Sequence, residues 1–262
     1  MNLRLTDLEF GYGETPVLNS VSFEINGAQF VSIIGPNGVG KSTLIHCINR
    51  ILTPQAGKVE IDGRDVGDIP QKELAKLVGY VPYSSGTSFP MSVVDTVMLG
   101  RYPHSGSRRT EADLRKVHSV LRMLRIEGLS LRSFNELSAG QHQKVMLARG
   151  LAQETGILLL DEPTANLDIR HQMDVAHMLR DLSHAKGIII VMICHDLNIA
   201  SRYSDRIILL SEGRVFADGA PGEVITADNI ERVYGVGCEV TEFEGRPHVM
   251  IRDSGEELVL FE

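Results

Sequence analysis

The chain has 262 residues, of which 43% are hydrophobic and 23% charged, and its formal net charge at pH 7 is -8. A chain of this size and hydrophobic content buries a sizeable core, which excludes an intrinsically disordered protein. The dispersed excess of carboxylates argues against a nucleic-acid backbone or an anionic membrane surface as the main partner.

The cysteines and the hydropathy pattern indicate the compartment. Cys47, Cys194 and Cys238 lie far apart and without metal-like spacing, so we interpret them as small buried residues in a reducing cytosol. The longest apolar run covers residues 188–194, which is well short of the roughly 20 residues of a membrane span. Met1 is followed by no signal pattern. We therefore expect a protein that is soluble by itself and reaches a membrane only through a partner.

The N-terminal part predicts a small antiparallel sheet. Residues 3–10 and 17–25 alternate weakly and are separated by a turn-rich loop over 11–16, and residues 58–64 add a strand with an Asp-Gly turn. Tyr12 lies in the first loop, where an exposed aromatic ring could stack on a base. Packing of the tyrosine on its neighbours is the alternative.

The next stretch matches G-x-x-x-x-G-K-[ST], between an apolar run over 30–34 and a helix-like segment over 44–52. Its inward-pointing amides would wrap a chain of phosphates, with a lysine at the β- and γ-phosphates and a hydroxyl for Mg²⁺. A glycine turn that happens to carry a lysine is the alternative, but the flanking strand and helix favour nucleotide binding. The predicted phosphate loop consists of Gly35, Pro36, Asn37, Gly38, Val39, Gly40, Lys41, Ser42 and Thr43.

The middle of the chain predicts a helical insertion. A short helix over 71–77, a strand over 78–81 and an irregular stretch over 82–90 precede it. Within the insertion Thr110 and Asp113 form a predicted capping box. The apolar face that follows consists of Leu114, Val117, Leu121 and Leu124.

Positive charges gather in the same insertion. The group contains Arg101, Arg108, Arg109, Arg115 and Lys116. We interpret these residues as a solvated helical face.

A further helix begins near residue 138 and runs to about residue 152. Ser138 and Gln141 form a predicted capping box, and the exposed amides at this helix start could hold an anion. From the residues alone, a helix cap without a ligand is the simpler alternative.

Polar residues follow two predicted buried strands. Residues 157–160 precede Asp161 and Glu162, and residues 188–193 precede Cys194 and His195. Ligands of parallel α/β sheets lie beyond the carboxyl ends of the strands, so we expect these side chains beside the phosphates. Asp161 would then serve Mg²⁺, Glu162 a water and His195 a phosphate. Capping of a strand end is the alternative for the two carboxylates.

The rest of the chain predicts an amphipathic helix over 173–182 and a hairpin of strands over 206–210 and 214–217. Weak alternation over 239–243, 248–252 and 257–261 indicates a small β tail.

Taken together, the phosphate loop, the 137–141 segment, residues 161–164, residues 166–168 and His195 resemble the nucleotide-binding subunit of ATP-binding-cassette (ABC) transporters. The resemblance implies an α/β fold: a P-loop NTPase core with a mixed, mainly parallel sheet, a small antiparallel β subdomain and a helical insertion. It implies one domain over residues 1–262, with the helical subdomain at about 89–153 and a β tail at about 236–262.

The resemblance also implies roles. Tyr12 stacks on adenine, Lys41 and its loop hold the phosphates, and Ser42 and Asp161 bind Mg²⁺. Glu162 polarises the attacking water, and His195 holds the γ-phosphate. The remaining implied nucleotide contacts come from a second copy of the chain, which closes head-to-tail around two ATP molecules: Ser138, Ala139, Gly140, Gln141 and Asp168.

Two positions depart from the family pattern. Ala139 replaces the usual glycine, which relatives tolerate, and Tyr83 replaces a glutamine that reaches Mg²⁺ and links the site to the membrane subunit. Tyr83 therefore puts the usual coupling contact in doubt.

Residues 100–104 and 233–235 resemble importers of ferric siderophores, haem and cobalamin. This implies a homodimer at the cytoplasmic face of the membrane, bound to multi-span permease subunits and served by a substrate-binding protein, with no nucleic acid. A soluble ABC ATPase that acts as an assembly or regulatory factor is the alternative.

Overall fold

The computed structural model describes residues 1–83, 90–106, 109–165 and 167–252. Within them, six strands form the central sheet in the order β10-β9-β3-β8-β7-β6. All neighbours in this sheet are parallel except β9 and β10, which confirms the predicted mixed, mainly parallel sheet. The strands are β3 (Gln29–Ile34), β6 (Val78–Val81), β7 (Ile157–Leu160), β8 (Ile189–Ile193), β9 (Arg206–Ser211) and β10 (Arg214–Gly219).

The predicted antiparallel sheet is also present, in the order β2-β1-β4-β5. The first connection is shorter than expected, because Tyr12 pairs with Thr15 and leaves a two-residue turn. Asp62 and Gly63 both have positive φ, 48° and 76°, which suits a tight two-residue hairpin turn. The strands are β1 (Asn2–Tyr12), β2 (Thr15–Asn26), β4 (Ala56–Ile61) and β5 (Arg64–Asp65).

Hydrophobic side chains cover both faces of the central sheet, because successive residues of a strand point to opposite sides. In β3, Phe30 and Ile34 join one core, whereas Val31 and Ile33 join the other. Helices α7 (Ile169–Lys186) and α8 (Leu197–Tyr203) contribute to the first core. Helices α1 (Lys41–Ile48) and α2 (Gln71–Leu77) pack into the second with the antiparallel sheet. Cys47 and Cys194 are buried, as predicted, whereas Cys238 is only partly buried.

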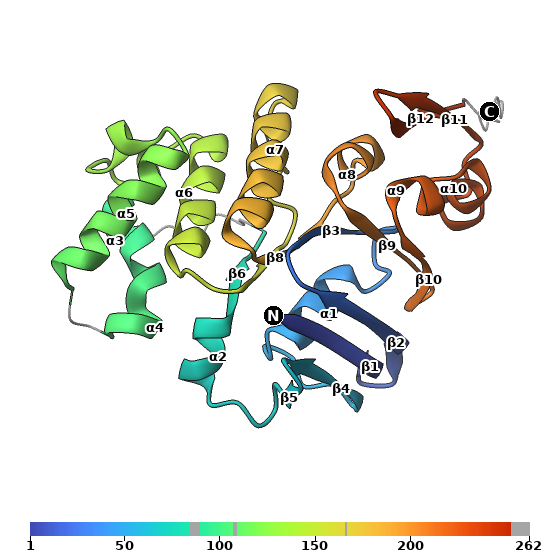
Figure 1. Cartoon of the computed structure of the whole chain (residues 1–262), viewed down its shortest axis with the longest axis horizontal. Coiled ribbons are helices and arrows are strands. Elements are labelled where there is room, and N and C mark those ends of the chain that lie inside the picture. Colours follow the sequence, from blue (N-terminus) through green and yellow to red (C-terminus); the bar gives the residue numbers. More distant parts are fainter. Residues whose placement is uncertain (84–89, 107–108, 166, 253–262) are drawn as a thin grey trace, which may run out of the picture.

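A group of helices lies at one side of the central sheet, and the C-terminal hairpin lies at the opposite end of the molecule (Figure 1). The helical group comprises α3 (Val93–Met98), η1 (Leu99–Arg101), α4 (Tyr102–Ser105), α5 (Glu111–Met123), η2 (Glu127–Leu129), η3 (Phe134–Glu136) and α6 (Ala139–Ala152). The C-terminal part comprises α9 (Pro221–Val224), α10 (Ala227–Tyr234), β11 (Cys238–Phe243) and β12 (Arg246–Ile251). The third predicted tail strand, over 257–261, lies outside the described residues.

The predicted capping box at the start of α5 is confirmed, but the apolar face is rotated from its expected position. Val117 and Leu121 are fully buried and Leu124 nearly so, whereas Leu114 is 40% exposed. Asp113 is itself buried, so the buried face of α5 is centred near this residue. Leu114 lies about 100° further round the helix and reaches only the edge of that face.

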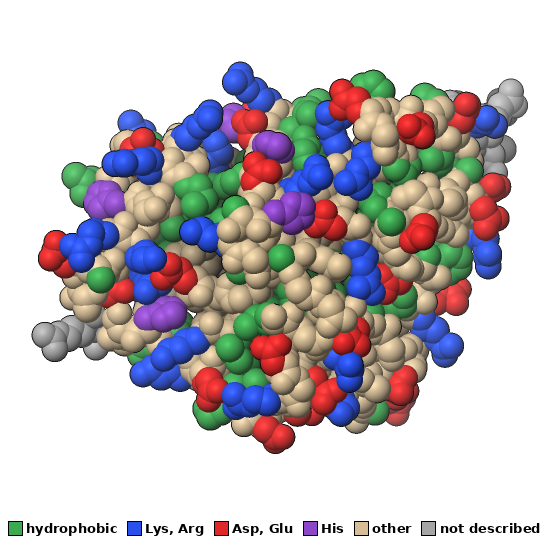
Figure 2. Space-filling model, in the orientation of Figure 1, with side chains coloured by type: hydrophobic (Ala, Val, Ile, Leu, Met, Phe, Trp, Pro, Cys, Tyr) green, Lys and Arg blue, Asp and Glu red, His purple; other side chains and the backbone are tan. Residues whose placement is uncertain are grey.

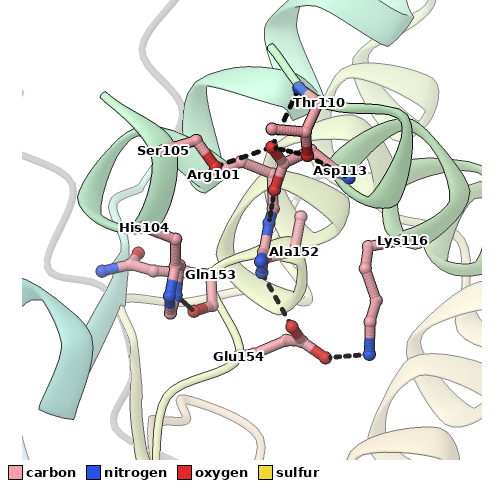
Figure 3. A network of polar contacts seen from close by, with 9 residues as sticks. All are labelled: Arg101, His104, Ser105, Thr110, Asp113, Lys116, Ala152, Gln153 and Glu154. Atoms are coloured by element: carbon pink, nitrogen blue, oxygen red, sulfur yellow. Dashed lines mark hydrogen bonds and ion pairs between the residues drawn. The ribbon is translucent and has the colours of Figure 1, made fainter. Parts of the chain in front are cut away.

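A buried ion-pair network explains this rotation and corrects the interpretation of Arg101 as part of a solvated face (Figure 3). Arg101 Nε lies 2.9 Å from Asp113 Oδ1, and the two side chains are only 11% and 4% exposed. Ser105 and Thr110 donate hydroxyl hydrogen bonds of 2.6 Å to Asp113 Oδ2. These hydroxyl groups and Arg101 hold the pKa of Asp113 far below its usual range, so the carboxylate is charged at neutral pH.

The other charges of this group are solvated. Arg109, Arg115 and Lys116 make exposed ion pairs, and Arg108 lies outside the described residues. Over the face seen in Figure 2, positive and negative side chains are interspersed without a large region of one sign. Among the helices of the described part, none is long and apolar enough to cross a membrane.

The Arg101–Asp113 pair should matter for stability. Arg101→Ala leaves a buried carboxylate without its partner, and we expect a loss of about 3 to 5 kcal/mol in the free energy of unfolding. The matched control is Arg115→Ala, which removes an exposed pair with Glu111 and should change the same free energy by less than about 1 kcal/mol. Urea unfolding curves measure both. A loss below about 1 kcal/mol in Arg101→Ala would contradict the structural importance of the pair.

Candidate active site

The phosphate loop connects the end of β3 to the start of α1. Residues 35–40 form the loop, and Lys41, Ser42 and Thr43 are the first residues of the helix. The helix begins three residues earlier than predicted and ends at Ile48, before the predicted end at residue 52. Arg50, which follows, has a left-handed φ of 55° that does not continue a helix. The positive end of the helix therefore lies directly at the loop.

Two glycines of the loop are required by their surroundings. Gly35 has a φ of 145°, and a Cβ there would lie 2.4 Å from the Leu210 carbonyl oxygen. Gly40 has a φ of 106°, and a Cβ there would lie 2.8 Å from Leu18 Cδ2. Any other residue would be strained at both positions.

Lys41 brings a buried positive charge to the loop. Its Nζ donates hydrogen bonds to the carbonyl oxygens of Gly35, at 2.7 Å, and Pro36, at 2.8 Å. Burial lowers the pKa of Lys41, while the charges of Glu162 and Asp161 act in the opposite direction. The ammonium group and the two carboxylates thus share one electrostatic environment.

Asp161 follows β7 and faces the start of α1. Ser42 Oγ donates to Asp161 Oδ1 at 3.2 Å, and the Asp161 amide donates to the Val81 carbonyl oxygen of β6 at 2.9 Å. Burial raises the pKa of Asp161, and the neighbouring Glu162 charge raises it further, although the bond from Ser42 opposes the shift. A hydroxyl and a carboxylate oxygen therefore converge at one point.

Glu162 and His195 meet at the ends of adjacent strands β7 and β8. His195 Nε2 lies 2.5 Å from Glu162 Oε1, and both side chains are partly exposed. Glu162 has a φ of 49°, a left-handed conformation that is uncommon outside glycine and is often found at functional sites. The two side chains form one polar pair at the solvent-accessible edge of the sheet.

Two further side chains surround Asp161, and the sequence analysis missed both. His46 Nε2 lies 2.9 Å from Tyr80 Oη, and their rings meet edge to face. Burial raises the pKa of Tyr80 to about 12, with a further contribution from Asp161. His46 follows Ser42 by four residues on α1, and this spacing on one helix face was the available signal.

The segment that begins α6 forms a second, separate site. Ser138 caps the helix by accepting a hydrogen bond from the Gln141 amide, while the Gln141 side chain accepts one from the Ser138 amide, so the predicted capping box is present. Asp168 caps α7 and lies 2.7 Å from His171 Nδ1. Ser138, Gly140, Gln141 and Asp168 line one pocket of about 570 Å³.

None of residues 35–43 lines this pocket, so the two groups of predicted site residues line different surfaces of the described chain. The pocket also contains two cationic side chains, Arg125 and Lys144, which the sequence analysis did not single out. Ala139 is the first residue of α6, and Asn166 lies outside the described residues.

Two tyrosines complete the predicted set. Tyr12 ends β1, is 56% exposed and meets Phe10 edge to face, with ring centroids 5.0 Å apart. This position fits both alternatives for Tyr12, since the ring packs on a neighbour and still offers an exposed face. Tyr83, two residues beyond β6, is 44% exposed.

Comparison with known proteins identifies the family. Residues 18–165 match the family model described as ABC transporter. An uncharacterized ABC transporter ATP-binding protein of Methanocaldococcus jannaschii is 44% identical over 95% of this chain and 98% of its own. The ferric enterobactin transport ATP-binding protein of Escherichia coli is 40% identical over 92% and 89%.

A solved structure agrees. The dimeric structure of a bacterial ABC transporter cassette covers 83% of this chain and 98% of its own, with a TM-score of 0.74 and 30% identity. On this fold, this site and these relatives, the chain belongs to the ABC transporter family, in which it is an ATP-binding subunit and an ATPase.

Proposed function

We propose that this chain is the ATP-hydrolysing subunit of a membrane importer for a metal chelate such as a ferric siderophore, haem or cobalamin, and that it works as a head-to-tail dimer with two ATP molecules between the subunits. The observation that carries the proposal is the Glu162–His195 pair beside Lys41, Ser42 and Asp161.

This arrangement suits phosphoryl transfer, which depends on positioning and on stabilisation of charge. Lys41 would neutralise phosphate charge, and the backbone N–H groups of the loop, which Pro36 lacks, would donate hydrogen bonds to the phosphate oxygens. Glu162 would polarise the attacking water, with His195 holding the carboxylate at 2.5 Å and facing the γ-phosphate. Tyr12 would stack on adenine through its exposed ring.

The residues present fit Mg²⁺. Ser42 Oγ and Asp161 Oδ1 lie 3.2 Å apart and are oxygen donors of the type that this hard cation prefers. Two carboxylates face a single ammonium group here, so the surroundings favour a further cation. When bound, Mg²⁺ would neutralise charge on the β- and γ-phosphates. Tyr83 is a poor ligand for such an ion, and we expect a water in place of the amide oxygen that relatives supply.

The pocket at the start of α6, lined by Ser138, supports the proposed dimer. Ser138 starts a 14-residue helix whose first amides face a pocket that contains Arg125 and Lys144, which suits an anion. No phosphate-loop residue lines this pocket, so we propose that the γ-phosphate bound here belongs to an ATP held by the phosphate loop of a second chain. Asp168 lines the same pocket and would lie at the seam.

The importer assignment rests on relatives and on residues 100–104. The relative from Escherichia coli is named for ferric enterobactin transport, and the match covers nearly all of both chains. The chain would sit at the cytoplasmic face of the membrane on permease subunits, to which a substrate-binding protein delivers the cargo. A soluble assembly or regulatory ATPase remains the competing function.

Removal of the Glu162 charge should separate ATP binding from turnover. Glu162→Gln keeps the side-chain shape but loses the charge that polarises water, so Mg²⁺-dependent phosphate release should fall at least about 100-fold. ATP affinity, measured by equilibrium binding, should stay the same. Glu60→Gln, on β4, is the matched control and should keep full turnover. Normal turnover in Glu162→Gln would remove this residue from its proposed role.

ATP should drive dimerisation of the Glu162→Gln form. Without hydrolysis the closed dimer accumulates, and analytical ultracentrifugation with and without ATP measures it. Ser138→Arg blocks the helix start and should keep the protein monomeric, whereas Ser119→Arg, at an exposed position of α5, should not. A monomer at every ATP concentration, even at high protein concentration and with the membrane partner, contradicts the dimer.

Association with a permease distinguishes the importer from a soluble factor. We expect the tagged chain, isolated from detergent-solubilised membranes of its own cells, to carry with it a protein with many membrane spans, identified by mass spectrometry. Recovery only from the soluble fraction, without such a protein, favours the assembly or regulatory ATPase.

A further inference from the structure

The segment η1–α4 contacts the C-terminal end of α6 at three positions, and Figure 3 shows those of Arg101 and His104. A Cβ on Gly100 would lie 2.2 Å from the Arg149 carbonyl oxygen, so the two backbones are in direct contact. Arg101 donates to the Ala152 carbonyl oxygen at 2.7 Å, and His104 Nε2 lies 2.8 Å from the Gln153 carbonyl oxygen. The opposite end of this helix carries Ser138.

Arg101 joins this helix end to α5 as well. Its guanidinium reaches Asp113 at 2.9 Å and Glu154 at 2.8 Å, and Lys116 of α5 holds the other Glu154 oxygen at 2.6 Å. A guanidinium can serve several acceptors at once because its five donors form a rigid fork. Arg101 thereby links the Ala152 carbonyl group to Asp113 of α5 and to Glu154, which follows α6.

The hydrogen bonds of Arg101 fix the axial position and tilt of α6, which apolar packing alone leaves free. Helix α6 also buries Val145, Leu147 and Ala148 in the core, but hydrophobic contacts are non-directional and tolerate small shifts and tilts. Charge-assisted hydrogen bonds are short and directional, so a helix held by one at its end keeps its axial position.

The same helix end contacts the strand that leads to the active site. Gln153 Nε2 donates to the carbonyl oxygens of Ala75 and Val78, at 2.6 and 3.1 Å. A Cβ on Gly150 would lie 2.4 Å from Val81 Cγ2, and the Val81 carbonyl accepts the Asp161 amide hydrogen bond. Arg101 is thus anchored to a helix end that is itself packed on the active-site sheet.

We propose that Arg101 is a positioning residue for Ser138: by holding the Ala152 carbonyl group, it sets the tilt of α6 and so places the Ser138 end against the second subunit's ATP. The inference rests on the proposed head-to-tail dimer. At a rise of 1.5 Å per residue, α6 is about 20 Å long, so a tilt of about 5° at Ala152 moves the Ser138 end by roughly 1.7 Å. A misplacement of about 1 Å can cost on the order of 100-fold in a positioned reaction.

The test uses Arg101→Lys in the Glu162→Gln form. A lysine keeps a positive charge near Asp113 but has one compact head group, which cannot hold Asp113, Glu154 and the Ala152 carbonyl oxygen together. ATP affinity of the monomer, measured at low protein concentration, should stay within about twofold, whereas the dimer dissociation constant with ATP should rise at least about tenfold. The matched control is Arg115→Lys on the exposed face of α5, which should change neither quantity.

The two measurements separate a change at the Ser138 end of α6 from loss of the whole fold, because general unfolding would abolish ATP binding in the monomer as well. If Arg101→Lys loses ATP binding in the monomer, Glu154→Gln decides instead. It changes a partly exposed partner of Arg101, and should weaken the dimer in the same direction with ATP affinity intact.

If the Glu162→Gln form dimerises equally well with and without the second substitution, Arg101→Lys or Glu154→Gln, the inference is wrong and the proposed function still stands. If the Glu162→Gln form itself stays monomeric at every ATP concentration, the head-to-tail dimer is wrong, and the inference is wrong with it.

Discussion

Parallel strands deliver their carboxyl ends to one edge of a sheet, and the active site of this protein depends on that constraint. Strands β3, β7 and β8 are paired in parallel, with Ile33 opposite Ile193 and Leu160 opposite Met192. The residues that follow these strands therefore emerge together. This register places Ser42 3.2 Å from Asp161, and His195 2.5 Å from Glu162, although 119 and 33 residues separate them in the chain.

The electrostatics of this edge follow from its burial. Lys41 and Asp161 are both removed from water, which lowers the pKa of the ammonium group and raises that of the carboxyl group. Lys41 is held by hydrogen bonds to the loop carbonyl oxygens, and Asp161 is held by a hydrogen bond from Ser42, the residue next to Lys41. Such a site suits a polyphosphate bound together with a cation, since the phosphates would contact Lys41 and the loop amides and the cation would contact the carboxylates.

In the proposed dimer, the helical group would complete the site of a second chain. Helix α6 begins at a capped, exposed end that suits a phosphate, and it ends in the network formed by Arg101, Asp113 and Glu154. Burying such charges costs desolvation free energy, so a simple apolar contact would serve stability equally well. A directional network at the helix end is better suited to fixing where the other end of the helix lies.

The sequence by itself determined the features that depend on neighbours a few residues apart. The phosphate loop, the capping boxes at Thr110 and Ser138, and the Asp62-Gly63 turn each follow from local backbone geometry, which a short motif specifies completely. The order of buried strands and the polar residues that end them could also be predicted, because period-2 and apolar runs are local patterns. The family resemblance added the roles of residues that no single pattern assigns.

Only the tertiary structure decided which distant side chains meet. Arg101 was expected on a solvated face, but its partners lie 12 and 53 residues away, and only their convergence makes its burial tolerable. The same convergence turned the buried face of α5 toward Asp113 and left Leu114 exposed. His46 of α1 and Tyr80 of β6 lie beside Asp161 because folding brings these two side chains into contact there. Whether a charge is buried depends on partners that the chain brings together only on folding, and a sequence pattern does not contain those distances.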